Sequence, residues 1–105
     1  MSDPDNPPLL IEPRQLVEIR ARGEPVVFVD VRSAEEHAAG TVEGAIHIPA
    51  AELPSRIGEL SAGALVITVC NHGGPRSCGA AERLRTLGFP RAVALKGGVH
   101  GSHKH

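Results

Sequence analysis

Two continuous apolar runs constrain the fold of this chain most strongly. They are "PVVFVDV", residues 25–31, and "ALVITV", residues 64–69. Each run is short, rich in β-branched residues and bounded by turn-forming residues, which is typical of a strand buried on both faces. Shorter strand candidates at 9–11, 44–48 and 92–95 alternate with helical segments. The sequence therefore predicts an α/β fold with a largely parallel sheet.

The helical segments have recognisable start and stop signals. Helices are predicted from Pro13 to just before Gly23, within residues 33–40, over 49–60 with an interruption near Pro54, and over 77–88. Ser33 and Glu36 form a capping-box pattern at the start of the second of these helices. In the first helix, we expect the apolar side chains to fall on one side; they belong to Leu16, Val17 and Ile19.

The size and charge of the chain limit what it can do. With 105 residues it accommodates one domain, which we place at 9–98, between a disordered lead-in at 1–8 and a flexible tail at 99–105. The net charge is −1, and the basic residues form no stripe. The chain contains no Tyr or Trp and two Phe residues, Phe28 and Phe89. The chain lacks both the basic stripe that neutralises phosphates and the aromatic side chains that stack on bases. We therefore expect no nucleic-acid partner.

No segment suggests a membrane or an export signal. The apolar runs fall well short of the roughly 20 residues that span a bilayer, and the stretch Met1–Pro8 is acidic and proline-rich. We therefore expect a cytoplasmic protein. Three tail histidines, His100, His103 and His105, have no fold around them, so we predict no metal site and no cofactor.

The candidate chemistry lies in the stretch "VCNHGGPRSCG", residues 69–79. Cys70 ends a predicted buried strand, and Gly73 and Gly74 allow the backbone N–H groups that follow to converge on an anion. The next helix adds its unpaired N–H groups and the positive end of its dipole, and Arg76 adds a permanent charge. Such surroundings favour the thiolate, so Cys70 is predicted to be a nucleophile in an anion cradle.

Several stretches together resemble the single-domain rhodanese family. They are "VVFVDVRSAEEHAAGTVEGAIHIP", "VITVCNHGGPRS" and "LGFPRAVALKGG", and the resemblance runs from about Ile11 to Gly98. It implies a five-stranded, mainly parallel sheet flanked by helices, with the active-site loop between a central strand and a helix N-terminus. It further implies a sulfurtransferase that carries sulfane sulfur as a persulfide on Cys70.

The resemblance also implies partners and site residues. The partners are a small anionic donor such as thiosulfate and a thiol or cyanide acceptor, with a sulfur-relay protein as a further candidate, and we expect a monomer or a weak dimer. Asp30 and Arg32 match family positions that are mostly structural. Arg76 joins Cys70 in the catalytic set, and the residues expected to bind the donor are Asn71, His72, Gly73, Gly74, Pro75 and Ser77.

Two alternatives remain open at this point. Five residues separate Cys70 from Arg76, which is the spacing of cysteine phosphatases and of arsenate reductases on the same fold. The loop supplies no carboxylic acid as a general acid, although His72 could serve. The second alternative function is that of a sulfur carrier or protein-binding module without catalysis.

Two roles also stay open for Cys78. It is either a small residue packed near the start of the helix or a resolving thiol for Cys70.

Overall fold

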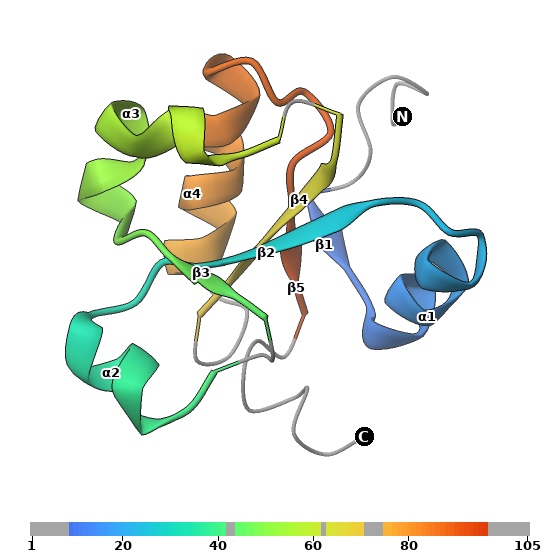
Figure 1. The fold of residues 1–105 in the computed structure, drawn as a ribbon, viewed down its shortest axis with the longest axis horizontal. Helices are drawn as coiled ribbons and strands as arrows, with labels where there is room; N and C mark the ends of the chain where they lie inside the picture. Colours follow the sequence, from blue (N-terminus) through green and yellow to red (C-terminus); the bar gives the residue numbers. More distant parts are fainter. Residues whose placement is uncertain (1–8, 42–43, 62, 71–74, 97–105) are drawn as a thin grey trace.

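The computed structural model describes residues 9–41, 44–61, 63–70 and 75–96. The predicted lead-in at 1–8 and tail at 99–105 lie outside these ranges. Through the described residues, five strands and a set of helices alternate along the chain (Figure 1). The strands are β1 (Leu10–Ile11), β2 (Val26–Asp30), β3 (Ile46–His47), β4 (Leu65–Val69) and β5 (Val93–Leu95).

The strands form one sheet in the order β1-β5-β4-β2-β3, and the four pairings are parallel. The α-helices are α1 (Pro13–Ala21), α2 (Ala34–Ala39), α3 (Leu53–Arg56) and α4 (Pro75–Thr86), and short 3-10 turns flank α3 at Ala50–Glu52 and Ile57–Glu59. Helix α1 lies on one side of the sheet, whereas α3 and α4 lie on the other (Figure 1). The predicted five-stranded α/β fold is confirmed.

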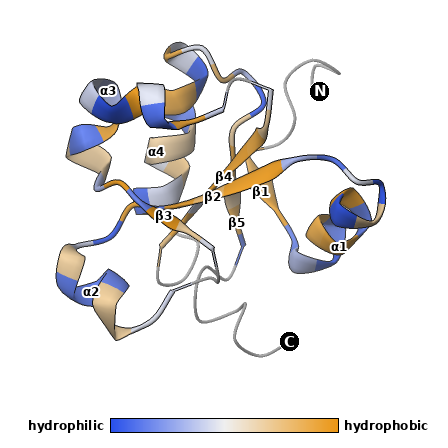
Figure 2. Ribbon diagram, viewed as in Figure 1, coloured by the Kyte–Doolittle hydropathy of each residue, from blue (hydrophilic) through white to orange (hydrophobic). Residues whose placement is uncertain are grey.

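The central strand β4 is buried on both faces, as its apolar composition predicts. Side chains alternate along a strand, so Leu65, Ile67 and Val69 pack in the core cluster on the α1 side. Val66 and Cys70 pack in the opposite cluster, with residues of α3 and α4. Figure 2 shows hydrophobic colouring along β2 and β4 and mixed colouring on the helices. The alternation fixes the sheet face to which the thiol belongs.

The prediction that the three apolar side chains of α1 share one side is wrong for Val17. Leu16 and Ile19, three positions apart, pack against the core cluster on their side of the sheet. Val17 is 67% exposed. Adjacent helical positions point about 100° apart, so Val17 leaves the face that Leu16 shares with Ile19.

Some predicted boundaries shift by a few residues. Helix α4 begins at Pro75, two residues before the predicted start, because proline suits a first helical turn in which backbone N–H groups have no partner. The predicted helix over 49–60 divides into α3 and two 3-10 turns, with Pro54 in the first turn of α3. The predicted capping box of α2 is confirmed, and Gly40 ends that helix as expected.

Candidate functional site

The candidate site lies at the carboxyl edge of the sheet, where β2 and β4 end side by side. Asp30, the last residue of β2, is in register with Val69, the last residue of β4, and with His47 of β3. Cys70 follows Val69 directly. Parallel strands bring their carboxyl ends to one edge, which is where ligands bind in open α/β sheets.

The Cys70 thiol faces the first turn of α4. Its side chain is buried, with 3% exposure, and its Sγ lies 3.2 Å from Oγ of Ser77, to which the thiol donates a hydrogen bond. Ser77 is fully buried. A serine hydroxyl rotates to suit its partner, so the same contact allows Ser77 to donate to a thiolate.

A second contact fixes this turn of α4 against the central strand. Thr68, which shares its sheet face with Cys70, donates a hydrogen bond of 2.7 Å from Oγ1 to the backbone carbonyl of Ser77. Thr68 is fully buried. The N-terminus of α4, with the positive end of its dipole, is therefore held at the end of β4 where the thiol lies.

Arg76 reaches across to α2. Its Nη1 and Nη2 donate to Oε1 and Oε2 of Glu36 at 3.1 and 3.2 Å, which makes a bidentate ion pair. The Arg76 side chain is 50% exposed and that of Glu36 is 31% exposed. The hydrogen bond to Glu36 raises the pKa of Arg76, and attraction to a Cys70 thiolate and to Asp30 also contributes. Arg76 is thus hydrogen-bonded to Glu36 of α2 and also attracts a Cys70 thiolate.

Asp30 is the centre of a buried polar network. Arg32 donates to it from its backbone N and from Nε, at 3.0 and 2.9 Å to Oδ1, and from Nη2 at 2.8 Å to Oδ2. Burial raises the pKa of Asp30, but hydrogen bonds from Arg32 and His37 outweigh it and hold that pKa below its usual value. Nη2 of Arg32 also donates to the carbonyl of Gly40 at 2.5 Å. This geometry ties the end of β2 to the end of α2.

Two histidines extend the network. Nδ1 of His37 lies 3.0 Å from Oδ2 of Asp30, and Nε2 of His47 lies 2.8 Å from the carbonyl oxygen of Arg32. Their rings stack with centroids 4.7 Å apart and planes 20° from parallel. The stack packs α2 against β3 beside the candidate site.

Cys78 is a free, partly buried thiol that packs against the core cluster containing Cys70. Burial raises the pKa of Cys78, and repulsion from the Cys70 thiolate adds to that increase. A raised pKa leaves less thiolate at neutral pH. The raised pKa therefore lowers the reactivity of Cys78 as a nucleophile at neutral pH.

The structure brings part of the predicted site together. Cys70, Arg76, Ser77, Asp30 and Arg32 lie at the carboxyl edge, and Pro75 begins α4. Four predicted donor-binding residues lie outside the described residues, namely Asn71, His72, Gly73 and Gly74. Four residues that contact the predicted site residues were not predicted with them: Glu36, His37, His47 and Thr68. The capping-box pattern singles out Glu36 for its helix alone, and nothing in the sequence pairs it with Arg76.

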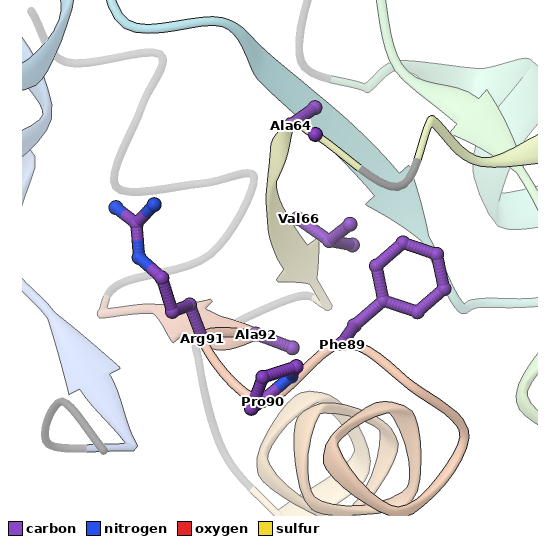
Figure 3. A pocket seen from close by; sticks show the side chains of 7 residues that line it. Ala64, Val66, Phe89, Pro90, Arg91 and Ala92 are labelled. Carbon is purple, nitrogen blue, oxygen red and sulfur yellow. The ribbon is translucent and has the colours of Figure 1, made fainter. Parts of the chain in front are cut away.

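A pocket of about 120 Å³ lies at the other edge of the sheet (Figure 3). Its walls come from residues at the amino ends of β4 and β5, and they are Gly63, Ala64, Val66, Phe89, Pro90, Arg91 and Ala92. Most of these side chains are apolar, and Arg91 is paired with Glu24. The pocket is thus separate from the thiol, which lies at the carboxyl end of β4.

The parallel sheet and the buried thiol facing a helix N-terminus define a class of α/β proteins with a cysteine at the end of the central strand. The rhodanese-like domain family matches residues 12–105. The chain belongs to this family. Within the described residues, no helix is both long and apolar enough to cross a membrane.

Individual relatives agree with the family match. The chain is 34% identical over 88 residues to thiosulfate sulfurtransferase GlpE of Pseudomonas entomophila, which covers 84% of this chain and 78% of that protein. It is 30% identical over 95 residues to a sulfurtransferase of Allochromatium vinosum, with 90% and 88% coverage. The solved structure of the human single-domain sulfurtransferase TSTD1 superposes with a TM-score of 0.77 at 26% identity, covering 93% of this chain and 97% of that one.

Other relatives are longer than this chain. It spans 24% of the HTH-type transcriptional regulator Rv0324 of Mycobacterium tuberculosis and 40% of the putative sulfur carrier protein YrkF of Bacillus subtilis. The family's domain therefore occurs both nearly alone and as part of larger proteins.

Proposed function

We propose that this protein is a sulfurtransferase that moves sulfane sulfur from a donor such as thiosulfate to cyanide or a thiol through a persulfide on Cys70. The observation that carries the proposal is the Cys70 sulfur, buried at the carboxyl end of the central strand and 3.2 Å from Ser77 in the first turn of α4. Support comes from the relatives named thiosulfate sulfurtransferase, sulfurtransferase and sulfur carrier protein.

The first half-reaction loads sulfur on the protein. The Cys70 thiolate attacks the sulfane sulfur of thiosulfate, a new S–S bond forms, and the S–S bond of thiosulfate breaks. Sulfite leaves with the electron pair of that bond. The hydroxyl of Ser77 and the dipole of α4 stabilise the negative charge on the Cys70 sulfur before attack and on the persulfide after it.

The second half-reaction returns the thiolate. Cyanide attacks the outer sulfur of the persulfide, the S–S bond to Cys70 breaks, and thiocyanate leaves while Cys70 regains its electron pair. A thiol acceptor reacts in the same way: its thiolate attacks the outer sulfur and leaves as a persulfide. Because no net oxidant or reductant is consumed, the reaction needs no cofactor. The acceptor, a sulfur-relay partner, the oligomeric state and the cytoplasmic location stay predictions.

The proposal is tested by intact mass measurement. We expect the reduced protein to gain the mass of one sulfur atom when it is incubated with thiosulfate, because the thiolate retains the sulfane sulfur. Cyanide should then remove the added mass. The two cysteines provide matched variants: Cys70→Ala should gain nothing, whereas Cys78→Ala should load like the wild type. Loading in Cys70→Ala, or none in the wild type, would contradict the proposal.

The five-residue spacing keeps phosphatase or arsenate reductase activity as the rival. Glu36 is the carboxylate that the structure brings to Arg76, but both of its oxygens accept from the guanidinium. That arrangement does not suit a general acid, which must release a proton to the leaving oxygen. The same protein sample should therefore show no hydrolysis of an aryl phosphate, and arsenate should produce no Cys70–Cys78 disulfide.

A further inference from the structure

The carboxylate of Glu36 is held in place by its own helix. Glu36 completes the capping box of α2, where its Oε1 accepts from the backbone N and from the hydroxyl of Ser33, each at 3.2 Å. In return, the Ser33 hydroxyl accepts from the backbone N of Glu36. These reciprocal bonds restrict the rotamers of the Glu36 side chain, so its carboxylate is ordered before it meets a partner outside α2.

Helix α2 is in turn anchored to the end of β2 by polar contacts. No residue of α2 is buried, so apolar packing contributes little to the position of the helix. Arg32 donates from Nη2 to the carbonyl of Gly40 at the end of α2. Nδ1 of His37 lies 3.0 Å from Oδ2 of Asp30, which is fully buried. Since Asp30 is the last residue of β2, these contacts fix α2, and with it Glu36, relative to the sheet.

Arg76 is the partner that Glu36 holds. Its two terminal nitrogens donate to the two oxygens of the Glu36 carboxylate, at 3.1 and 3.2 Å. Arg76 directly precedes Ser77, whose Oγ lies 3.2 Å from the Cys70 sulfur, and its positive charge attracts a Cys70 thiolate. The Arg76 side chain is 50% exposed, so without a partner the guanidinium would spread over many rotamers. Its average attraction to the thiolate would then weaken, since that attraction decreases with distance and with the access of water.

We propose that Glu36 is a positioning residue: by holding the guanidinium of Arg76 at the first turn of α4, it increases the fraction of Cys70 that is thiolate at neutral pH. The inference rests on the proposed function only in taking Cys70 as the reactive group. The carboxylate has to act through Arg76, because its own negative charge repels a thiolate. A variant that keeps the charge and changes the geometry therefore separates the two effects.

Glu36→Asp is that variant, because it keeps the charge and shortens the reach of the carboxylate toward Arg76. The readout is the pH midpoint of Cys70 alkylation by iodoacetamide, measured in the Cys78→Ala protein, where Cys70 is the single thiol. We expect Glu36→Asp to raise this midpoint by about half a pH unit, the size expected for the loss of an exposed ion pair. Alkylation below the midpoint should slow about threefold. An unchanged or lowered midpoint would overturn the proposal.

Glu35→Asp is the matched control. Glu35 is the exposed neighbour of Glu36 in the same helical turn, so the same shortening is made while the Arg76 pair stays intact. It should leave the midpoint within about 0.1 pH unit of the value for the Cys78→Ala protein. An equal rise in the two variants would mean that the midpoint follows the stability of α2 and not the position of Arg76, which overturns the proposal.

A double-mutant cycle tests whether Glu36 acts through Arg76. Arg76→Gln should raise the midpoint by itself, because the thiolate loses a nearby cation. In the Arg76→Gln protein, Glu36→Asp should then have no further effect. No rise in Arg76→Gln, or an equal effect of Glu36→Asp with and without Arg76, would contradict the inference. Alkylation needs no sulfur donor, so the expected midpoints without sulfur loading at Cys70 would contradict the proposed function alone.

Discussion

Ser77 contributes two groups to the candidate site, and they face different neighbours. Its hydroxyl lies 3.2 Å from the Cys70 sulfur, and its backbone carbonyl accepts the hydrogen bond from Thr68. We predict that the side chain stabilises a Cys70 thiolate, whereas the backbone contact anchors α4. Substitutions at Ser77 and at Thr68 should therefore separate an effect on the reactivity of Cys70 from an effect on the stability of the fold.

Ser77→Ala should slow the chemistry of Cys70 without unfolding the protein. With the hydroxyl removed, the thiolate loses a charge-assisted hydrogen bond, so the pH midpoint of Cys70 alkylation should move upward. We expect the alkylation rate at pH 7 to fall about three- to tenfold, which corresponds to roughly 1 kcal/mol. The rate is measured with iodoacetamide in the Cys78→Ala protein.

Ser55→Ala is the control for this effect. Ser55 is exposed in α3, and its hydroxyl donates to the backbone carbonyl of Glu52, far from Cys70 in the sequence. Its substitution should leave the pH midpoint unchanged. An unchanged midpoint in Ser77→Ala would mean that the contact with Ser77 does not stabilise the Cys70 thiolate.

The residues of the site differ in how far the sequence reveals them. The location of Cys70 and Arg76 at the carboxyl edge of the sheet could be predicted, because Cys70 follows a buried strand and Arg76 lies at the start of the next helix. The contact between Glu36 and Arg76 depends on how α2 packs near α4, which no local pattern encodes. Thr68 reads only as a strand residue until the facing carbonyl of Ser77 is known.

At the scale of elements, the hydrogen bond from Thr68 joins β4 to α4 in the core. Thr68→Val keeps the shape of the side chain and removes its hydroxyl, so the carbonyl of Ser77 loses a buried donor. We expect the free energy of unfolding to fall by about 1–2 kcal/mol, measured by urea denaturation. Sulfur loading at Cys70 should also slow, because the first turn of α4 is less firmly held.

Thr86→Val is matched to this substitution. Thr86 donates to the carbonyl of Arg83 at 2.7 Å, the same distance as in the Thr68 contact, but it is exposed at the end of α4. Water can replace that donor, so the loss should stay below about 0.5 kcal/mol. Equal losses in the two variants would contradict the assignment of a special anchoring role to Thr68.

The elements themselves were predictable to different degrees. Strands β2 and β4 stand out because burial on both faces demands unbroken apolar runs, and α2 stands out through its capping box. The order of the strands in the sheet was not predicted, since composition and hydrophobic pattern do not specify which strands pair. Val17 was misplaced because proximity in sequence was taken for a shared helical face.

At the scale of the molecule, Asp30 connects the sheet to α2 and should make stability depend on pH in acid. Folding lowers the pKa of Asp30, so the unfolded chain binds more protons as the pH falls. Its contribution is complete above about pH 4, the ordinary value for aspartate, and is lost as the pH falls through the lowered value. The free energy of unfolding should therefore decrease steadily below pH 4.

Asp30→Asn tests this dependence. At pH 7 it should cost about 3 kcal/mol, because Arg32 keeps a buried charge without its carboxylate. Between about pH 4 and 2 its stability should fall less steeply than that of the wild type. Glu18→Gln, at an exposed position of α1, should follow the wild-type curve. Parallel acid curves for Asp30→Asn and the wild type would assign the acid dependence to other carboxyl groups.

Because side chains alternate along β4, the effect of an inserted residue depends on whether it lies within the strand or after it. Cys70 faces α4 because it directly follows β4 and stands an even number of positions after Val66 and Thr68. One residue inserted within β4 would turn the thiol toward α1, away from Ser77, however well the sheet accommodated it. One residue inserted between Cys70 and Pro75 would leave the thiol on its face. We therefore expect this part of the chain to tolerate an insertion after Cys70 better than one within β4.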